Sequence, residues 1–435
     1  MKIGVYEAKD RGLRELRVWS KAYAIRTYND GLYSDIEQEK WQAAFAEGIS
    51  ALGETATTAE VIALSGTTPG LTAIADDGKA LYPAILMLDQ RSRTQAANII
   101  EAIGIDRLLA ETGNMPVAGG CSLASILWLR DNEPEVFERA RWFGHSNTYF
   151  AGWLTGSYCI DPSSASLTAL YNTTRNDLTW NEEISGAFGI SADRLPRLIR
   201  SNESCGQVTA ARARELGFAG RPHVVIGGND AVLAAWSVGI REPGEIINVN
   251  GTAEITLVCL PQCFGSTAYN VRAHVLPDRW LTLYVMNAGG KAYEWFHSLF
   301  CRELSADQFY GRFVPEALDS WVDRDNAVDY VPYLMGSRYS LENLKAGFVN
   351  LTPETSREQL LAAMVRSLCR YQREHLKEIA LRVPLADAIT LTGGASNESR
   401  IRAKQRWMRD GDYVYQEQSS MRGAALLGLD YLQRS

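Results

Sequence analysis

Hydrophobic and polar positions near the start of the chain alternate with the two-residue period of β-strands. Residues 3–8 and 16–28 show this alternation on either side of a polar Asp10-Arg11-Gly12 turn, and together they predict a β-hairpin. Residues 37–53 instead repeat their apolar positions at helical spacing and predict an amphipathic helix. Two further strand patterns follow: a buried strand at 61–66 and a hairpin at 72–87 that turns at Asp77-Gly78.

Farther along the chain, apolar positions at helical spacing stand between Pro and Gly residues and predict more helices. These helices cover residues 93–103, 122–132, 146–155 and 357–380. Residues 160–180 are polar and predict a loop with a strand near Leu170.

Strand patterns resume after Arg241-Glu242-Pro243-Gly244, which predicts a domain boundary there. Each half then opens with strands and continues with alternating helices and strands, which predicts a duplicated α/β architecture. We expect an N-terminal domain at 1–240 and a C-terminal domain at 241–435. Strand patterns of the second half are predicted within 245–260, 280–290, 388–394 and 412–417, with a last helix at 422–432.

The amino-acid composition and charge argue against some classes of protein function. The chain has 435 residues, a formal net charge of −7 and 46% hydrophobic residues, which is typical of a globular protein. The negative charge and the lack of clustered Lys and Arg argue against nucleic acid as a partner. No apolar run is long enough for a membrane span, and the charged N-terminus does not resemble a signal peptide. Seven scattered cysteines favour buried thiols in a reducing cytoplasm, so we expect a cytoplasmic protein.

Four glycine-containing turns follow predicted strands, where the ligands of open α/β sheets gather. None has the spacing of a dinucleotide fingerprint or a P-loop, but the backbone N–H groups of such turns can bind phosphate. The turns are Ser65–Gly70, Gly227–Asp230, Asn250–Thr252 and Thr392–Asn397.

Asp230 is the first candidate for chemistry, because it follows a buried strand and two glycines and precedes a helix. A carboxylate there either caps the helix or acts as a base at the end of the strand. The residue type alone does not separate these two roles.

Together these turns and their neighbours resemble the FGGY family of carbohydrate kinases. GGND at 227–230 is similar to the motif that carries the family's catalytic aspartate, and ALYPAILMLDQRS to its W-x-D-x-R hairpin, with Leu88 in place of an aromatic residue. NTYFAGWLTGSYCIDPSSAS resembles the next family segment, with Thr148 in place of the usual Asp. Further motifs match in the same order: NVNGTAEI, NAGGKAYEWF, YLMGSR with AGFVNLTPETSREQLLAAMV, LTGGASNESR and QSSMRGAALLG.

The resemblance implies an α/β protein with two RNase H-like domains of the actin and hexokinase superfamily and a cleft between them. It implies transfer of a phosphoryl group from ATP, with Mg²⁺, to a hydroxyl of a sugar, ketose or polyol. The N-terminal domain would bind the sugar and the C-terminal domain the nucleotide, and a homodimer is among the expected assemblies.

The resemblance also assigns roles to residues at matching positions. Asp230 would be the general base, and no metal ligand is assigned. Sugar contacts would come from Thr67, Thr68, Asp89, Arg91 and Asn229, and nucleotide contacts from Gly251, Thr252, Gly290, Gly394, Ala395 and Asn397.

The sequence departs from the family pattern at two places. The family's opening strand and its D-x-G-T-T/S phosphate turn have no counterpart before residue 3, so we expect either a shortened start with an upstream extension or a catalytically degenerate relative that binds a sugar or nucleotide. Thr68-Pro69 stands where xylulokinase-like members have Met-His, which leaves the sugar open. An actin- or chaperone-like ATPase is a weaker alternative, because such proteins lack the sugar elements.

Overall fold

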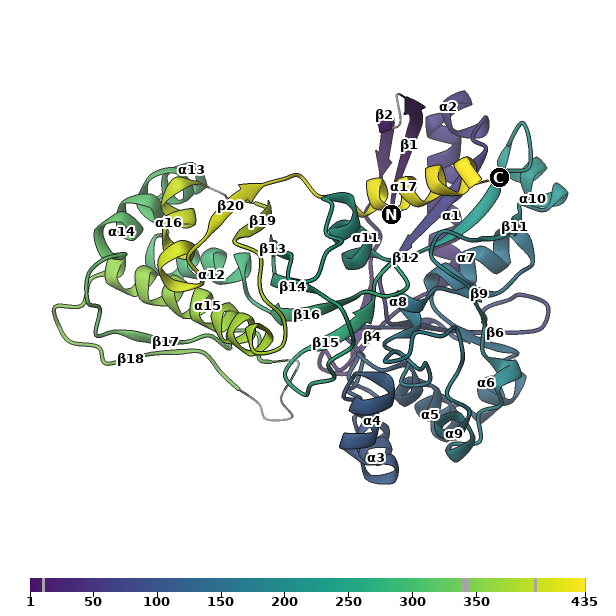
Figure 1. Ribbon diagram of the computed structural model, residues 1–435, viewed down its shortest axis with the longest axis horizontal. Helices are drawn as coiled ribbons and strands as arrows, with labels where there is room; N and C mark the ends of the chain where they lie inside the picture. Colours follow the sequence, from purple (N-terminus) through teal and green to yellow (C-terminus); the bar gives the residue numbers. More distant parts are fainter. Residues whose placement is uncertain (10–11, 338, 340–343, 395–396, 435) are drawn as a thin grey trace. The chain divides into compact units, whose positions relative to one another are not determined.

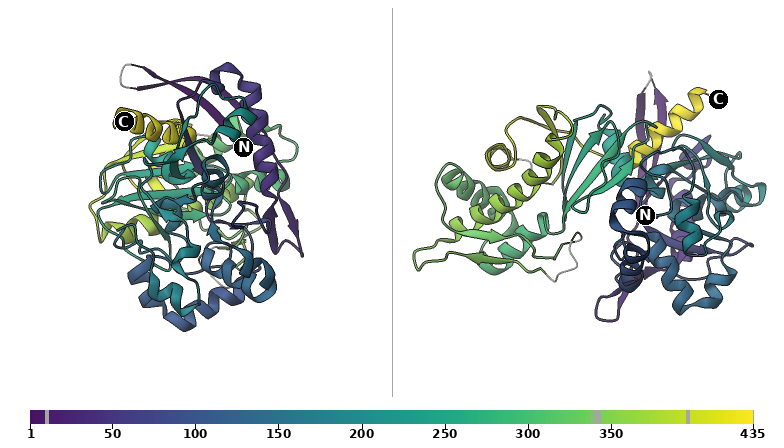
Figure 2. Two further views of the ribbon diagram at one scale, coloured as in Figure 1. Left: turned by 90° about the vertical axis from the view of Figure 1, so that its right-hand side faces the viewer. Right: turned by 60° about the horizontal axis from the view of Figure 1, so that its bottom comes forward.

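The chain packs into two compact units, which Figures 1 and 2 show in colours that follow the sequence. The computed structural model describes residues 1–9, 12–337, 339, 344–394 and 397–434. Unit 1 comprises Met1–Gly239, Gln262–Trp280 and Ser419–Ser435, and unit 2 comprises Ile240–Pro261 and Leu281–Gln418. The sequence-based division at 240/241 differs from these units, because 262–280 and 419–435 pack with unit 1.

Asp230 follows the central strand of a three-stranded sheet in unit 1. Strand β12 (His223–Asn229) runs parallel to β5 (Val61–Gly66) and antiparallel to β11 (Ser204–Gln207). Helices α11 (Asp230–Ser237) and α17 (Ser420–Arg434) pack against this sheet, with Val225, Leu233 and Leu427 in one buried cluster. Burial of this apolar surface explains why the C-terminal helix belongs to unit 1.

The C-terminal helix α17 also contacts the N-terminal hairpin, and Figure 1 shows the yellow helix beside two purple strands. Strands β1 (Lys2–Lys9) and β2 (Gly12–Ser20) pair antiparallel, which confirms the first predicted hairpin in part. Its second strand was predicted to continue to residue 28, but it ends at Ser20, and Arg26–Tyr28 belong to another sheet. The amphipathic helix α1 (Gln38–Leu52) packs on these strands and buries Trp41, Phe45 and Ile49 in the core, as its apolar spacing predicts.

A second sheet of unit 1 has the strand order β3-β4-β7-β6-β8, and each pair in it is antiparallel. The predicted turn at Asp77-Gly78 is confirmed, since Gly78 N donates to Ala75 O at 2.9 Å and β6 pairs with β7. The strands are β3 (Arg26–Tyr28), β4 (Tyr33–Ile36), β6 (Gly70–Ile74), β7 (Ala84–Leu86) and β8 (Trp142–Gly144).

The predicted helices at 93–103, 122–132 and 146–155 are confirmed as α3 (Arg93–Ile103), α5 (Ser122–Asn132) and α7 (Ser146–Thr155). The other elements of unit 1 are short. They are α2 (Glu54–Thr57), α4 (Ile105–Thr112), α6 (Pro134–Arg139), β9 (Cys159–Ile160), α8 (Pro162–Ala165), α9 (Glu182–Ala187), a 3₁₀ turn (Ala192–Arg194), β10 (Arg197–Leu198), α10 (Ala210–Leu216) and β15 (Asn270–Ala273).

The predicted loop at 160–180 is confirmed over most of its length, although residues 160–173 are buried. Helix α8 lies within this segment, and the predicted strand near Leu170 is only a single bridge between Tyr171 and Trp180. The hydroxyls are accommodated by local bonds: Ser166 Oγ donates to Pro162 O and Thr168 Oγ1 donates to Ala165 O, both at 2.7 Å.

Unit 2 is built on a sheet whose strands run in the order β16-β14-β13-β19-β20. Strand β13 pairs antiparallel with β14 and parallel with β19, which in turn pairs parallel with β20. The strands are β13 (Ile246–Asn250), β14 (Glu254–Leu260), β16 (Trp280–Met286), β19 (Ala388–Gly393) and β20 (Asp412–Tyr415).

Helices of unit 2 include α15 (Arg357–Ala380), which confirms the predicted long helix. The side chains of Ser356 and Gln359 form a capping box at its start, which explains why the helix begins there. The remaining elements are α12 (Gly290–Phe300), α13 (Ala306–Gln308), a π-helical turn (Phe309–Phe313), α14 (Val314–Trp321), β17 (Asp329–Val331), β18 (Gly347–Val349) and α16 (Glu398–Trp407).

Candidate functional site

The junction of β12 and α11 places Asp230 at the end of a buried strand (Figure 1). The pairing of β12 with β5 shifts register between Val225 and Gly228, and Gly227 adopts a φ of +63° at this irregularity. Only glycine takes this conformation readily, which explains the first glycine of the Gly227-Gly228 pair. The irregularity sets the direction in which the chain enters the helix.

Asn229, rather than Asp230, is the N-cap of α11. Its Oδ1 accepts hydrogen bonds from the backbone N–H groups of Ala231 at 3.1 Å and Val232 at 3.3 Å. The expectation that Asp230 caps the helix is therefore corrected, because the residue before it already has the extended backbone and the side chain of a cap. Asp230 is the first residue of the helix, where the helix dipole favours a negative charge.

Three donors hold the carboxylate of Asp230. Oδ2 accepts from Thr67 Oγ1 at 3.1 Å, and Oδ1 accepts from Asn229 Nδ2 at 3.0 Å and from Ala231 N at 2.8 Å. Burial raises the pKa of the Asp230 carboxyl above its usual value, while the charge of Arg272 and these donors lower it. Asp230 nevertheless remains partly exposed within the chain. The carboxylate is thus fixed in orientation and still reachable.

A second group of polar side chains surrounds Thr68 and Asn229, next to Asp230. Asn229 Nδ2 donates to Thr68 Oγ1 at 3.1 Å, and Arg272 Nη1 donates to the same oxygen at 2.6 Å. The backbone N–H of Asn229 donates to Ser163 Oγ at 2.9 Å, and Ser163 in turn bonds to Asp161. Of the predicted sugar residues, Thr67, Thr68 and Asn229 are therefore assembled around Asp230.

Asp89 and Arg91 belong to a different buried network. Arg91 Nε donates to Asp89 Oδ1 at 2.9 Å and Nη2 donates to Asp35 Oδ2 at 2.9 Å, and all three side chains are 0% exposed. Asp89 Oδ2 also accepts from Ser34 N at 2.6 Å. The expectation that both residues grip a sugar directly is thus at odds with their burial, since their polar atoms already bond within the protein.

The predicted nucleotide residues of unit 2 meet at the ends of β13 and β19. Gly290 N, in the first turn of α12, donates to Gly251 O at 2.8 Å, Lys291 N donates to Thr252 O at 3.2 Å and Gly394 N donates to Asn250 O at 2.9 Å. Gly251, Thr252 and Gly394 are exposed. A Cβ on Gly290 would lie 2.7 Å from Gly251 O, so only glycine fits this close approach.

Asn397 is present in this region in a structural role, since its Oδ1 caps α16 by accepting from Arg400 N at 3.0 Å. Ala395 lies outside the described residues. Exposed backbone groups beside the N-terminus of α12 suit a phosphate chain. Within the described ranges, no group of three or more His, Cys, Asp or Glu is placed to hold a metal ion, so no metal ligand is assigned.

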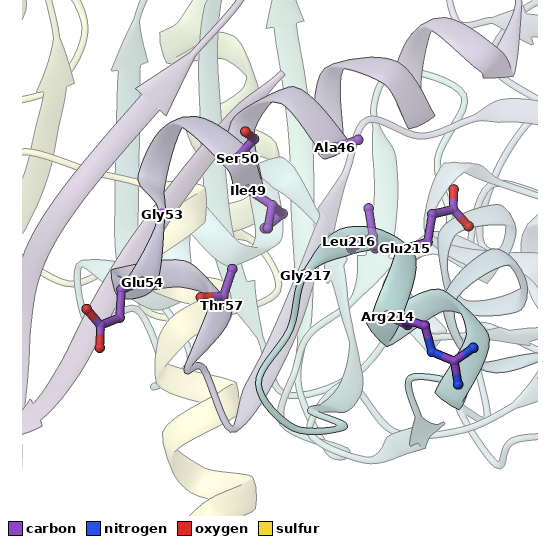
Figure 3. A pocket seen from close by; sticks show the side chains of 10 residues that line it. All are labelled: Ala46, Ile49, Ser50, Gly53, Glu54, Thr57, Arg214, Glu215, Leu216 and Gly217. Atoms are coloured by element: carbon purple, nitrogen blue, oxygen red, sulfur yellow. The ribbon is translucent and has the colours of Figure 1, made fainter.

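A pocket of about 450 Å³ also opens on unit 1, between α1, α2 and α10 (Figure 3). Ile49, Thr57, Arg214 and Leu216 are among its lining residues. None of the predicted site residues lines this pocket, so the pocket is separate from the Asp230 cluster of unit 1 and from the predicted nucleotide residues of unit 2.

Comparisons with known proteins agree with this arrangement. Residues 14–237 match the N-terminal domain of the FGGY family of carbohydrate kinases. The chain belongs to the FGGY family of carbohydrate kinases. It is thus a carbohydrate kinase of the two-domain actin/hexokinase-type fold, and the predicted α/β class is confirmed. Among the described residues, no helix is long and apolar enough to cross a membrane.

Individual relatives are similar over most of the chain. A xylulose kinase of Lactococcus lactis is 27% identical over 388 residues, which are 87% of this chain and 75% of the relative. A gluconokinase of Bacillus subtilis is 26% identical over 381 residues, which are 85% of this chain and 73% of the relative. The crystal structure of a xylulose kinase from Rhodospirillum rubrum, at 20% identity, matches with a TM-score of 0.86 over 95% of this chain and 85% of that one.

Sequence reasoning missed Arg272 and Ser163 as members of the Asp230 cluster. Arg272 is separated from Thr68 by 204 residues, so no local pattern connects them. One signal was present: Arg272 interrupts a short apolar strand between Val271 and Ala273. A charged residue in such a strand is rarely buried without a partner.

Proposed function

We propose that this FGGY kinase transfers the γ-phosphoryl group of ATP to a hydroxyl of a sugar or polyol, with Asp230 as the general base. The observation that carries the proposal is the carboxylate of Asp230, which three donors orient while the residue stays partly exposed. A general base needs a fixed direction and access to the substrate proton, and this carboxylate has both.

The reaction joins the hydroxyl oxygen of the substrate to the γ-phosphorus and breaks the bond between that phosphorus and the β–γ bridging oxygen. ADP leaves, and the hydroxyl proton passes to Asp230. Positioning contributes most of the rate in phosphoryl transfer, so the base acts late, as the forming bond makes the hydroxyl acidic. Mg²⁺ enters this proposal only as the ion bound to the phosphates of ATP.

The sugar side of the site comes from unit 1. We assign Thr67 to the surface that contacts the sugar, because this residue is exposed and its hydroxyl donates a hydrogen bond to Asp230. Thr68 and Asn229 orient the base from behind. Asp89 and Arg91 are given an indirect role, in which their buried ion pair shapes the strands of the second sheet.

The nucleotide side comes from unit 2. We assign Gly251 and Thr252 to the phosphates of ATP, together with Gly290 at the start of α12. Backbone N–H groups and a helix N-terminus favour such anions. Gly394 is assigned to the surface under the adenosine, because its exposed backbone carries no side chain that would block a flat ring.

The test measures ADP release by the purified chain with Mg-ATP across ketoses, sugar acids and polyols. Ketoses and sugar acids come first, because the relatives are named as xylulose kinases and a gluconokinase. Asp230→Asn should lower sugar-dependent release by about 100-fold or more, the usual contribution of a general base. Asp76→Asn is the matched control, since Asp76 is exposed in the turn between β6 and β7.

The outcomes separate the alternatives. Sugar-dependent release that Asp230→Asn removes and Asp76→Asn retains supports the proposal. Release that persists in Asp230→Asn excludes Asp230 as the base. A folded chain that binds a sugar or ATP but releases no ADP would favour the non-catalytic binding relative instead.

A further inference from the structure

Strand β15 brings a buried arginine to the Asp230 cluster of unit 1. Its backbone is held on both sides of Arg272: Asn114 Oδ1 accepts from Val271 N at 2.9 Å, and Ser166 Oγ accepts from Ala273 N at 2.9 Å. Asn114 Nδ2 also donates to Val271 O at 2.8 Å. Side chains alternate along a strand, so this anchoring of the two neighbours fixes the direction of Arg272.

Arg272 is 3% exposed, and its guanidinium bonds to two segments of the site. Nη1 donates to Thr68 Oγ1 at 2.6 Å and to Ser163 O at 3.3 Å, and Nη2 donates to Thr68 O at 3.0 Å. A guanidinium presents its donors in a rigid planar fork, so one side chain fixes the loop after β5 and helix α8 together.

The hydroxyl of Thr68 connects Arg272 to the base. Thr68 Oγ1 accepts from both Arg272 Nη1 and Asn229 Nδ2, and Asn229 Nδ2 also donates to Asp230 Oδ1. A hydroxyl oxygen has two lone pairs, and these two donors occupy both of them. The rotamer of Asn229 is therefore fixed from one side by Thr68 and from the other by the helix that it caps.

We propose that Arg272 is a positioning residue for the kinase reaction, which orients Thr68 and Asn229 next to Asp230 and favours the charged form of the Asp230 carboxylate. This inference rests on the proposed function for its kinetic consequence, but its electrostatic part concerns this chain alone. An uncharged residue at position 272 would remove a hydrogen-bond donor from the hydroxyl of Thr68. It would also remove the positive charge that acts on the Asp230 carboxylate.

Electrostatics agree with the geometry. Burial raises the pKa of the Asp230 carboxyl, and the charge of Arg272 is the largest influence that lowers it. The same charge adds to burial in lowering the pKa of His145, which places the guanidinium near both groups. Such a cation favours the charged form of a carboxylate and disfavours the charged form of an imidazole.

Other titratable groups around Asp230 are few among the described residues of unit 1. Asp161 bonds to Ser163 and accepts from Ser164 N at 3.1 Å. His274, the residue after β15, accepts from Leu276 N at 3.0 Å and packs against Trp236 of α11. On α17, which packs against α11, Arg422 donates to Leu13 O at 3.3 Å. Arg272 is thus the cation placed to act on Asp230.

The test compares Arg272→Met and Arg272→Lys with the parent chain, using the pH profile of kcat/KM for sugar-dependent ADP release. Arg272→Met should lower kcat/KM at pH 6 by about 10- to 100-fold, the loss of a charge-assisted hydrogen bond, and the loss should shrink as the pH rises. Arg272→Lys keeps the positive charge, so it should recover part of the kcat/KM that Arg272→Met loses at low pH. Arg279→Met, between β15 and β16, is the control and should leave the profile unchanged.

A second measurement needs no activity. Aspartate labelled with ¹³C at the carboxyl gives a resonance for Asp230 that Asp230→Asn identifies, and its titration midpoint should rise in Arg272→Met. Thr68→Val removes the hydroxyl but keeps the guanidinium, so it should lower kcat/KM without moving the Asp230 midpoint as far. Near-ultraviolet circular dichroism checks that each variant is folded.

The outcomes keep the two proposals apart. A parent chain without sugar-dependent ADP release contradicts the proposed function, while the carboxyl titration still decides the role of Arg272. An unchanged Asp230 midpoint in folded Arg272→Met, or a loss of kcat/KM that is equal at every pH, overturns the inference. If Arg272→Met does not fold, Arg272→Gln replaces it: a midpoint above that of the parent chain supports the inference, and an unchanged midpoint overturns it.

Discussion

Gly227 lies directly against the carbonyl oxygen of Leu64, such that a Cβ on Gly227 would stand 1.7 Å from that oxygen. The φ of Gly227 is +63°, which side chains rarely adopt. Both constraints arise at the register shift between β12 and β5, which comes shortly before Asp230 in the chain. The direction of the proposed base thus depends on a residue without a side chain.

Gly227→Ala should therefore destabilise unit 1 strongly. We expect the free energy of unfolding in urea to fall by about 3 kcal/mol or more, because strand β12 must move away from β5. Gly220→Ala is the control, since nothing lies within 4 Å of a Cβ at that exposed position. Equal unfolding midpoints for the two variants would contradict the close approach.

Arg91→Met should cost about 3–5 kcal/mol of unfolding free energy, because it leaves the buried carboxylates of Asp35 and Asp89 without their cation. The guanidinium also lies 4.3 Å from the ring centroid of Tyr33, which adds a cation–π contact. Arg93→Met, at an exposed position, should change little. Urea unfolding of both variants measures the difference, and a similar loss in each would refute the buried network.

The stability of the protein should also fall between pH 6.5 and pH 4 through His145. Burial lowers the pKa of His145 to about 3, whereas an unfolded chain restores its usual value of 6.5. A neutral buried histidine contributes fully above pH 6.5, and this contribution is lost as the pH falls toward 3, by about 1.4 kcal/mol per pH unit. Urea unfolding across this range should give a shallower pH slope in His145→Gln, and an unchanged slope would argue against burial of the neutral ring.

Lys404→Met tests the buried ion pair next to Gly251 and Thr252, the residues that we propose to bind phosphate. Lys404 and Glu254 form a buried ion pair at 2.6 Å, and Asn248 Nδ2 donates to the same Glu254 oxygen at 3.0 Å. Removing the cation should cost about 3–5 kcal/mol of unfolding free energy and weaken ATP binding, since Glu254 begins β14 just after Thr252. The double variant Lys404→Met/Glu254→Gln should recover part of the stability. No recovery would mean that the lysine acts without its partner.

Much of the secondary structure follows from the sequence, because its signals are local. The helix at 357–380 has its apolar spacing and its capping box within one segment, so pattern and structure agree. The helices at 93–103, 122–132 and 146–155 agree for the same reason. Where hydroxyl side chains obscure the pattern, as at 160–173, the sequence indicates a loop although the segment is buried.

In the candidate site, too, some features follow from the sequence and others do not. The glycine turns at 227–230 and 250–252 mark the strand ends, and the structure brings Gly251 to Gly290 as the motifs suggest. A cap at Asp230 was one of the two roles that the sequence left open, and the structure gives the cap to Asn229, which also suits that position by type. The family resemblance assigned Asp89 and Arg91 to the sugar, yet their side chains pair in the interior.

The sequence by itself determined the α/β class, the long helices and the position of Asp230 after a buried strand, because periodicity and turn chemistry act over a few residues. Only the tertiary structure decided what surrounds that aspartate. Arg272 meets Thr68 across 204 residues, and the helix at 420–434 returns to pack beside β5. Such contacts depend on burial and chain direction, which no local segment encodes.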